Sequence, residues 1–344
     1  MIQITNMLES ISNNYKNKCV LVTGATGMIG QNIIYLLISM NDIYRANVHI
    51  IAHCRNYTKA ESTFKDVMER KDMEFLTCDI KELDTDKHVD FIVHTASITG
   101  GSKQHLDYPM RTISTALEGA KRVLDLALRD KAAAVFLSSL EVYGFTGENL
   151  EEISETDGGY IDCTNPRSSY SESKRMCECM FSSYYKQYGI PTFIARLTAT
   201  FGAGVSKEDK RVFAQFAHSI IEKKDIVLKS TGKTVRNYCD AADAATALLI
   251  ILVNGNPGEA YNVANMEAEI SIKDMAQRFI DLYPSRGSNF VFDLSEDVTK
   301  LGYNKEMRCV LNSTKLLGIG WKPVYNMDDM ILHLVDSMKK QIKS

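Results

Sequence analysis

Three side chains in the middle of the chain have the types and the spacing needed to move a proton. Tyr170 and Lys174 are four residues apart, so they share one face of the helix expected there, and Ser138-Ser139 lies about thirty residues earlier. We expect the Lys174 ammonium and a nicotinamide cation to lower the pKa of Tyr170 from about 10, which makes it an acid or base near neutral pH. Ser139 can hydrogen-bond the reacting oxygen, so this set could move a proton while a nicotinamide moves a hydride.

A glycine-rich motif near the N-terminus could hold the pyrophosphate of that dinucleotide. Its sequence is Thr-Gly-Ala-Thr-Gly-Met-Ile-Gly at 23–30, spaced Gly-x-x-Gly-x-x-Gly rather than Gly-x-Gly-x-x-Gly. The first glycine permits a tight turn, the second lets the backbone approach the phosphates, and the third lets the helix pack closely, with its N-terminus facing the phosphates. The candidate contacts in this motif are Gly24, Thr26, Gly27, Met28, Ile29 and Gly30. In this order along the chain, the two motifs indicate a nicotinamide-dependent enzyme.

The expected second strand gives a clue to which dinucleotide binds. Sites for NAD(H) carry Asp or Glu at its end, but here the run is Ala-His-Cys-Arg-Asn at 52–56. Arg55 could contact a 2′-phosphate, which favours NADP(H) over NAD(H), or it could be a solvated loop charge. Asp79 and Ile80, after the third strand, could bracket the adenine, or Asp79 could only cap the strand end. The remaining candidate cofactor contacts are Thr95, Ala96 and Lys174.

The elements that must position these residues alternate between strand and helix. Apolar runs predict strands near 18–23, 48–52, 74–79, 91–96, 134–138 and 191–196, with helices near 30–40, 112–129 and 171–188. This alternation predicts an α/β fold, a Rossmann-type doubly wound parallel sheet, over residues 1–200. Residues 201–344, with helices near 213–222, 241–253 and 272–283, are expected to form a smaller, interleaved, mixed α/β substrate-binding region. Part of this region, near 240–263, is expected to return to the sheet.

Composition excludes several other classes of protein. The chain has 344 residues and a formal net charge of −3, which does not suggest a nucleic-acid binder. The N-terminus lacks a signal-peptide pattern, and the longest apolar stretch, 244–253, is too short to span a bilayer, so we expect a cytoplasmic protein without a membrane partner. Eight cysteines form no regular framework, and Cys177 and Cys179 diverge on a helix, so we expect reduced thiols and no metal site.

Taken together, these motifs resemble the extended short-chain dehydrogenase/reductase family, which contains the nucleotide-sugar epimerases and dehydratases. The matching segments are 23–30, 138–144, 170–174, Arg196 with Phe201-Gly202, 258–263, and 318–323 with Trp321. The resemblance covers nearly the whole chain and implies a Rossmann domain, a nucleotide-sugar substrate and a homodimer. It also implies an arginine that holds the substrate diphosphate. Arg236 matches that segment, and Arg211 and Arg308 are further candidates.

The chain departs from the family pattern at the substrate end. The family's 4,6-dehydratases carry Thr-Asp-Glu where this chain has Ser139-Leu140-Glu141, and Leu140 cannot donate a proton, so dehydration is disfavoured. Glu141 could act as a base, orient a sugar hydroxyl, or only bond to its loop. Ala116 and Ala199 replace asparagines, which indicates a remodelled substrate end. Lys103, in the segment 95–103 expected to line the pocket, could reach a phosphate or a sugar oxygen.

Three functions fit this sequence. In the first, NADPH reduces a keto group on a nucleotide-linked sugar, for example a CDP-linked keto-sugar to a polyol, and Arg55 and Leu140 favour it. In the second, a redox-neutral epimerase or dehydratase oxidises the sugar, alters it, and returns the hydride to a retained NAD(P). The third is a redox-sensing binding protein without activity, against which the intact Ser139, Tyr170 and Lys174 argue.

Overall fold

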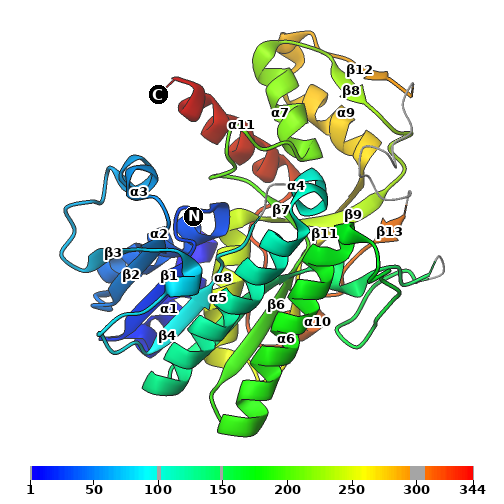
Figure 1. The fold of residues 1–344 in the computed structure, drawn as a ribbon. Helices are drawn as coiled ribbons and strands as arrows, with labels where there is room; N and C mark the ends of the chain where they lie inside the picture. Colours follow the sequence, from blue (N-terminus) through cyan, green and yellow to red (C-terminus); the bar gives the residue numbers. More distant parts are fainter. Residues whose placement is uncertain (1, 99–101, 148–149, 295–306, 344) are drawn as a thin grey trace.

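A seven-stranded sheet forms the centre of the computed structural model, which describes residues 2–98, 102–147, 150–294 and 307–343 (Figure 1). The strand order is β10-β6-β5-β4-β1-β2-β3, and every neighbouring pair is parallel. Because helices cover both faces, these strands are near-continuous apolar runs rather than alternating ones. The strands are β1 (Cys19–Thr23), β2 (His49–Cys54), β3 (Met73–Thr77), β4 (Phe91–His94), β5 (Ala133–Ser139), β6 (Thr192–Leu197) and β10 (Ala260–Val263).

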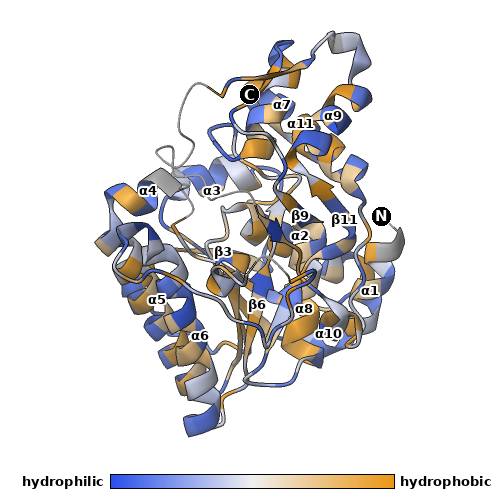
Figure 2. Cartoon of the chain, turned by 90° about the vertical axis from the view of Figure 1, so that its right-hand side faces the viewer, coloured by the Kyte–Doolittle hydropathy of each residue, from blue (hydrophilic) through white to orange (hydrophobic). Residues whose placement is uncertain are grey.

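Two helical layers cover the sheet. One face packs against α1 (Ile2–Ser12), α2 (Met28–Tyr44) and α8 (Ala241–Asn254), and the other packs against α5 (Pro109–Asp130) and α6 (Ser169–Tyr188). Helix α8 is hydrophobic along most of its length (Figure 2), as expected for a helix that is buried on nearly all sides. Helix α6 carries Tyr170 and Lys174 in its first turns, beside the end of β5.

A smaller region lies where β6 and β10 end, because both strands run directly into its sheet (Figure 1). That sheet has the order β11-β9-β13, with β7 also paired to β9. Helices α7, α9 and α11 pack around a separate apolar cluster that includes Phe216, Phe279 and Leu334. The elements are β7 (Ala199–Phe201), β9 (Val235–Asp240), β11 (Asn265–Ser271), β13 (Arg308–Cys309), α7 (Val212–Glu222), α9 (Ile272–Leu282), α11 (Met327–Lys343) and the parallel pair β8 (Ile226–Leu228) and β12 (Phe290–Phe292).

Short elements complete the fold. They are α3 (Tyr57–Phe64), α4 (Ser102–Asp107), α10 (Thr314–Leu317) and the 3-10 turns η1 (Asn13–Tyr15), η2 (Ile80–Glu82), η3 (Leu140–Tyr143), η4 (Pro166–Ser168) and η5 (Pro284–Arg286). Turn η3 follows β5 and turn η4 precedes α6, so both lie next to the candidate catalytic residues.

The predicted fold class, a doubly wound parallel sheet with a smaller mixed region, is confirmed. The predicted strands and helices correspond to β1–β6, α2 and α5–α9, whereas α11 and the short helices α3, α4 and α10 were not predicted. Helix α1 was not predicted either. Its Ile4, Leu8 and Ile11 are buried in the cluster that α2 and α8 share. The division into residues 1–200 and 201–344 stays a prediction. Among the described residues, no helix is both long and apolar enough to cross a bilayer.

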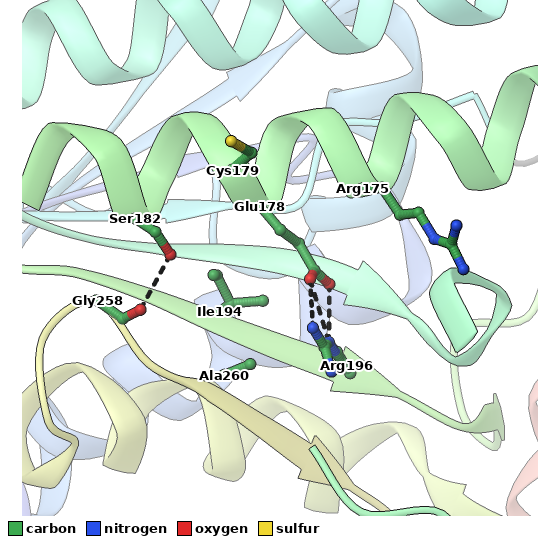
Figure 3. Close-up of a pocket in the computed structure, with 8 residues that line it drawn as sticks. All are labelled: Arg175, Glu178, Cys179, Ser182, Ile194, Arg196, Gly258 and Ala260. Carbon is green, nitrogen blue, oxygen red and sulfur yellow. Dashed lines mark hydrogen bonds and ion pairs between the residues drawn. The ribbon is translucent and has the colours of Figure 1, made fainter. Parts of the chain in front are cut away.

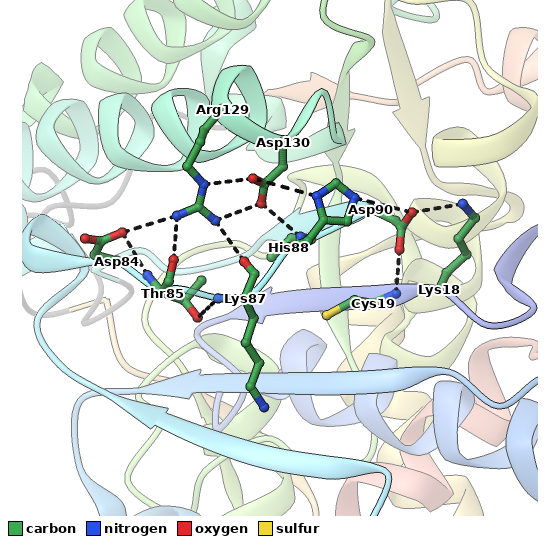
Figure 4. Close-up of polar contacts among 10 residues, drawn as sticks. Lys18, Cys19, Asp84, Thr85, Lys87, His88, Asp90, Arg129 and Asp130 are labelled. Atoms are coloured by element: carbon green, nitrogen blue, oxygen red, sulfur yellow. Dashed lines mark hydrogen bonds and ion pairs between the residues drawn. The ribbon is translucent and has the colours of Figure 1, made fainter.

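Charged side chains pair with one another at the amino ends of β1 and β4 (Figure 4). Lys18 donates to Asp90 at 2.9 Å, and Arg129 donates to Asp130 at 2.8 Å. The hydrogen bond from Arg129 lowers the pKa of the Asp130 carboxyl below its usual value. The backbone N–H of Val89 also donates to Asp130, at 2.9 Å, so this end of the sheet is a closed network of hydrogen bonds and ion pairs.

Candidate active site

The loop between β1 and α2 fits a dinucleotide pyrophosphate. Gly24 has φ +69°, and a Cβ there would lie 2.8 Å from the Ala96 Cα, so only glycine suits the position. A Cβ on Gly30 would lie 2.3 Å from the Gly24 carbonyl oxygen, so α2 starts close to the loop only because residue 30 is glycine. Gly27, exposed, is the N-cap of α2 and supplies no side-chain cap, which leaves the first N–H groups of this 17-residue helix open to an anion.

The expected adenosine end of this site presents an unpaired cation. Arg55 is exposed directly after β2 and forms no hydrogen bond or ion pair with the described residues. The next residue, Asn56, caps α3 by accepting from the Lys59 N–H at 3.0 Å, which fixes the start of that helix beside Arg55. The geometry suits a phosphate contact by Arg55.

The other candidate cofactor residues differ in how they are placed. Asp79 accepts from the Lys81 N–H at 3.0 Å and so caps η2. Ile80 is 3% exposed and packs beside Gly119 of α5. Thr95 is fixed by a 2.6 Å hydrogen bond from its hydroxyl to the Thr23 carbonyl. Ala96 lies against the glycine loop.

Ser139, Tyr170 and Lys174 meet at the carboxyl end of β5. The Ser139 side chain lies close enough to the Tyr170 hydroxyl to lower the pKa of the phenol. Lys174 is 2% exposed, and its ammonium donates to the Leu137 carbonyl at 2.6 Å, 5.7 Å from the centroid of the Tyr170 ring. Burial lowers the pKa of Lys174 to about 8.

The expectation that Lys174 lowers the pKa of Tyr170 does not describe this structure. Burial, followed by the charge of Glu141, raises the pKa of Tyr170 to about 12. The largest opposing effects come from the hydrogen bond with Ser139 and from the charges of Arg211 and Arg167. The Lys174 ammonium donates to the Leu137 carbonyl rather than to the phenol, and it is not among the main effects on the pKa of Tyr170.

Glu141 lies two residues after Ser139, and two side chains donate hydrogen bonds to its carboxylate. A single guanidinium nitrogen of Arg167 donates to both of its carboxylate oxygens, at 3.1 and 3.2 Å. The Ser171 hydroxyl donates to one of the same oxygens at 3.2 Å. The Glu141 backbone N–H in turn donates to Ser139 Oγ at 3.2 Å, so the carboxylate and the catalytic hydroxyl share one turn.

The positively charged side chains that could bind the substrate diphosphate fall into two groups, unpaired and paired. The side chain of Arg236, on β9, forms no hydrogen bond or ion pair with the described residues, and its Nε is buried. Arg211 is paired with Asp209 at 2.6 Å, although its charge still reaches Tyr170, and Arg308 is paired with Glu269. The side chain of Lys103 lies outside the described part of the chain. Arg236 is therefore the candidate whose guanidinium an anionic ligand would pair.

A hollow lies between α6 and the strands β6 and β10, and its charged side chains are already paired (Figure 3). Arg196 donates to Glu178 at 2.7 Å, and the Ser138 hydroxyl donates to the same carboxylate at 2.5 Å. Ser182 donates to the Gly258 carbonyl at 3.0 Å. This hollow is thus held together by its own side chains and does not contain Tyr170.

Three residues of the site were missed by sequence reasoning. They are Arg167 and Ser171, which hold Glu141, and His105, whose ring centroid lies 4.7 Å from that of Tyr170. Ser171 sits next to Tyr170 in the recognised motif, and Arg167 precedes it by three residues, so position alone could have marked both. No sequence signal places His105 there, since it depends on how α4 folds over α6.

Comparisons with known proteins support a relationship along most of the chain. The model of the NAD dependent epimerase/dehydratase family matches residues 20–264. UDP-glucuronic acid decarboxylase 1 of Xenopus tropicalis is 25% identical over 99% of this chain and 79% of its own length. The dTDP-D-glucose 4,6-dehydratase of Bos taurus is 27% identical over 89% of this chain and 84% of its own.

Solved structures share the fold. The dTDP-glucose 4,6-dehydratase of Bacillus anthracis in complex with NAD has a TM-score of 0.77 at 20% identity, over 95% of this chain and 98% of its own. RMD of Pseudomonas aeruginosa complexed with NADPH has a TM-score of 0.72 at 19% identity, over 94% and 99%. At these identities the likeness concerns the fold.

Proposed function

This chain belongs to the NAD-dependent epimerase/dehydratase family, and from that premise we propose that it is a redox-neutral enzyme that decarboxylates a nucleotide-linked uronic acid. The observation that carries the proposal is the juxtaposition of the Ser139–Tyr170 pair with Glu141, while Leu140 offers no acid between them. The relatives named above, a decarboxylase and a dehydratase, support the redox-neutral alternative over net reduction of a keto group.

Decarboxylation needs less from the protein than dehydration does. A 4,6-dehydration requires a group that protonates a departing hydroxyl, and Leu140 cannot do this. Once the C4 hydroxyl of a uronic acid is a ketone, the C5 carboxylate is β to it and leaves as CO₂. The electron pair of the broken bond stays on the sugar as an enolate, which takes a proton at C5. No acid at position 140 enters this balance.

The chain's own residues would hold and move protons around this chemistry. The bound nicotinamide supplies the reversible removal of a hydride from a sugar carbon. Tyr170 takes the hydroxyl proton at C4 and later returns it, while Ser139 orients that oxygen. Glu141, held next to Ser139, would relay the proton that C5 takes up, and Arg236 would bind the diphosphate with a guanidinium that has no partner among the described residues.

The dinucleotide fits the β1–α2 loop, and we propose NADP(H) as the preferred form. The support is Arg55, an exposed guanidinium after β2 where NAD(H) sites carry a carboxylate. Structures of the same fold hold NAD or NADPH, so the preference rests on Arg55. We also propose the homodimer that the family resemblance implies.

The experiment supplies the purified protein with UDP-glucuronic acid or dTDP-D-glucose and adds no reductant. We expect CO₂ and a UDP-pentose from the uronic acid, in many turnovers per retained dinucleotide, and no keto sugar from dTDP-glucose. Formation of a 4-keto-6-deoxy sugar from dTDP-D-glucose would show that the enzyme is a dehydratase and would contradict the proposed decarboxylation. Turnover that requires stoichiometric NADPH would contradict the redox-neutral proposal.

A further inference from the structure

We propose that Arg167 is a positioning residue of this active site, which together with Ser171 fixes the Glu141 carboxylate beside the Tyr170–Ser139 pair. The geometry stands independently of the reaction, and only the kinetic part of the test rests on the proposed function. The inference assigns a role to a residue that neither motif contains.

The contacts of Glu141 leave its carboxylate little freedom. Its side chain is 32% exposed and would be free to rotate, but Arg167, itself 21% exposed, donates to both oxygens. Ser171 is 7% exposed and donates to one of them from another direction. Two donors that converge on one carboxylate from separate elements, η4 and α6, select a single orientation.

The backbone of η4 presets the position of Arg167. The Asn165 side chain accepts from the Arg167 N–H at 3.0 Å, and Pro166 restricts the turn between them. Helix α6 starts two residues later and carries Tyr170 in its first turn. The backbone positions of Arg167 and Tyr170 therefore belong to one short, capped segment, and the contact with Glu141 then orients the guanidinium.

The turn that carries Glu141 also contacts Ser139 through its backbone. The Glu141 backbone N–H donates to Ser139 Oγ at 3.2 Å, and Ser139 in turn lowers the pKa of Tyr170. The carboxylate raises the pKa of Tyr170 and the guanidinium of Arg167 lowers it, so the pair limits the net charge that Tyr170 experiences. Without Arg167, a mobile carboxylate would stand uncompensated next to the phenol.

If the contact between Arg167 and Glu141 served stability alone, its loss would leave the rate of the folded enzyme unchanged. The first test therefore measures the kinetics of the folded variants. We expect Arg167→Gln to lower kcat by about 10- to 100-fold with KM within about threefold, since a displaced group costs rate rather than binding. Its kcat profile should move to higher pH, because Tyr170 loses a charge that lowers its pKa. Arg167→Lys should restore part of kcat. The double variant with Glu141→Gln should be no slower than Glu141→Gln alone.

Arg278→Gln provides the matched control. Arg278 forms a comparable arginine–carboxylate pair with Asp328, between α9 and α11, away from Tyr170. We expect its kcat and pH profile to equal those of the wild type. If Arg167→Gln behaves like Arg278→Gln, the proposal is overturned.

The second test needs no substrate and so separates this inference from the proposed function. In protein labelled with 3-fluorotyrosine, with Tyr170→Phe to assign the resonance, ¹⁹F NMR follows the ionisation of residue 170. We expect Arg167→Gln to raise its midpoint and Glu141→Gln to lower it. If the wild type turns over no nucleotide sugar, the proposed function fails, but this titration still tests whether Arg167 and Glu141 act on Tyr170. An unmoved midpoint in both variants overturns the inference.

Discussion

The two ends of the large sheet treat their charged groups in opposite ways. At the amino ends of β1 and β4, Asp90 and Asp130 are each held by a cation and the network is closed (Figure 4). At the carboxyl ends, burial raises the pKa of Tyr170 to about 12 and lowers that of Lys174 to about 8. Arg236, on β9 of the smaller region that follows these ends, has no side-chain partner among the described residues. The charged side chains at the amino end of the sheet are therefore paired with one another, whereas those at and beyond the carboxyl end are not all paired.

This difference indicates which end evolved for stability and which for chemistry. Buried polar groups in proteins are almost always satisfied, so a closed network needs no ligand to explain it. Groups with strongly shifted pKa values, together with an unpaired cation, cluster where a ligand completes the site. The hollow near Glu178 and Arg196 resembles the amino end of the sheet, because its arginine and carboxylate are paired with each other (Figure 3).

Tyr170→Phe should have the largest effect at the carboxyl end of the sheet. Removing the hydroxyl deletes the proton carrier, and general acid–base catalysis contributes about 10²- to 10⁴-fold, so we expect a loss of about 10³-fold in kcat. Dinucleotide binding, followed by fluorescence, should remain largely intact. Activity within about tenfold of the wild type would mean that Tyr170 does not carry the proton.

Arg236→Gln should weaken substrate binding. A charge-assisted hydrogen bond contributes about 1.5–3 kcal/mol, which corresponds to a rise of roughly 10- to 150-fold in the dissociation constant for UDP. Calorimetric titration with UDP measures it, with Arg308→Gln as the control because Arg308 is already paired with Glu269. Equal losses in the two variants would remove the distinction between paired and unpaired arginines.

Arg55→Ala should reduce binding of NADPH more than that of NADH. An exposed phosphate contact is expected to contribute about 1 kcal/mol, so the ratio of the two dissociation constants should change by about five- to tenfold. Fluorescence titration of both dinucleotides gives this ratio. The same loss for both would remove the case for recognition of a 2′-phosphate.

Asp130→Asn should show the smallest effect and only on stability. Arg129 lowers the pKa of Asp130, so the stabilisation is present at neutral pH and is lost as the pH falls below about 4 through the folded-state pKa. We expect a loss of about 1 kcal/mol at pH 7 that shrinks towards pH 2, with kcat unchanged. Urea unfolding across this pH range measures it. A large fall in kcat would break the comparison between the two ends.

The sequence was sufficient for the sheet but not for the way the site is held. Buried strands such as β1 and β5 appear as continuous apolar runs, and the glycine spacing marks their connection to α2, so the fold class could be predicted. Helix α1 has apolar residues at 4, 8 and 11, a helical spacing that is diluted by the polar residues around it.

Pairing between loops could not be predicted in the same way. Arg167 and Glu141 are 26 residues apart, and their contact depends on how η3 and η4 turn. Whether an arginine is paired also depends on its neighbours in space, which is why Arg211, Arg236 and Arg308 were equal in type but differ in structure. The direction of the Lys174 ammonium, towards Leu137, follows from packing that periodicity does not describe.

The most direct test of the central claim follows a deuterium atom placed at C4 of UDP-glucuronic acid and of dTDP-glucose. The purified protein is incubated with each sugar without added dinucleotide, and the products are analysed by mass spectrometry and NMR. A redox-neutral site at the carboxyl end of the sheet predicts a UDP-pentose that retains deuterium at C4 over many turnovers. Deuterium that leaves the sugar for good, or turnover that consumes added NADPH mole for mole, would contradict it.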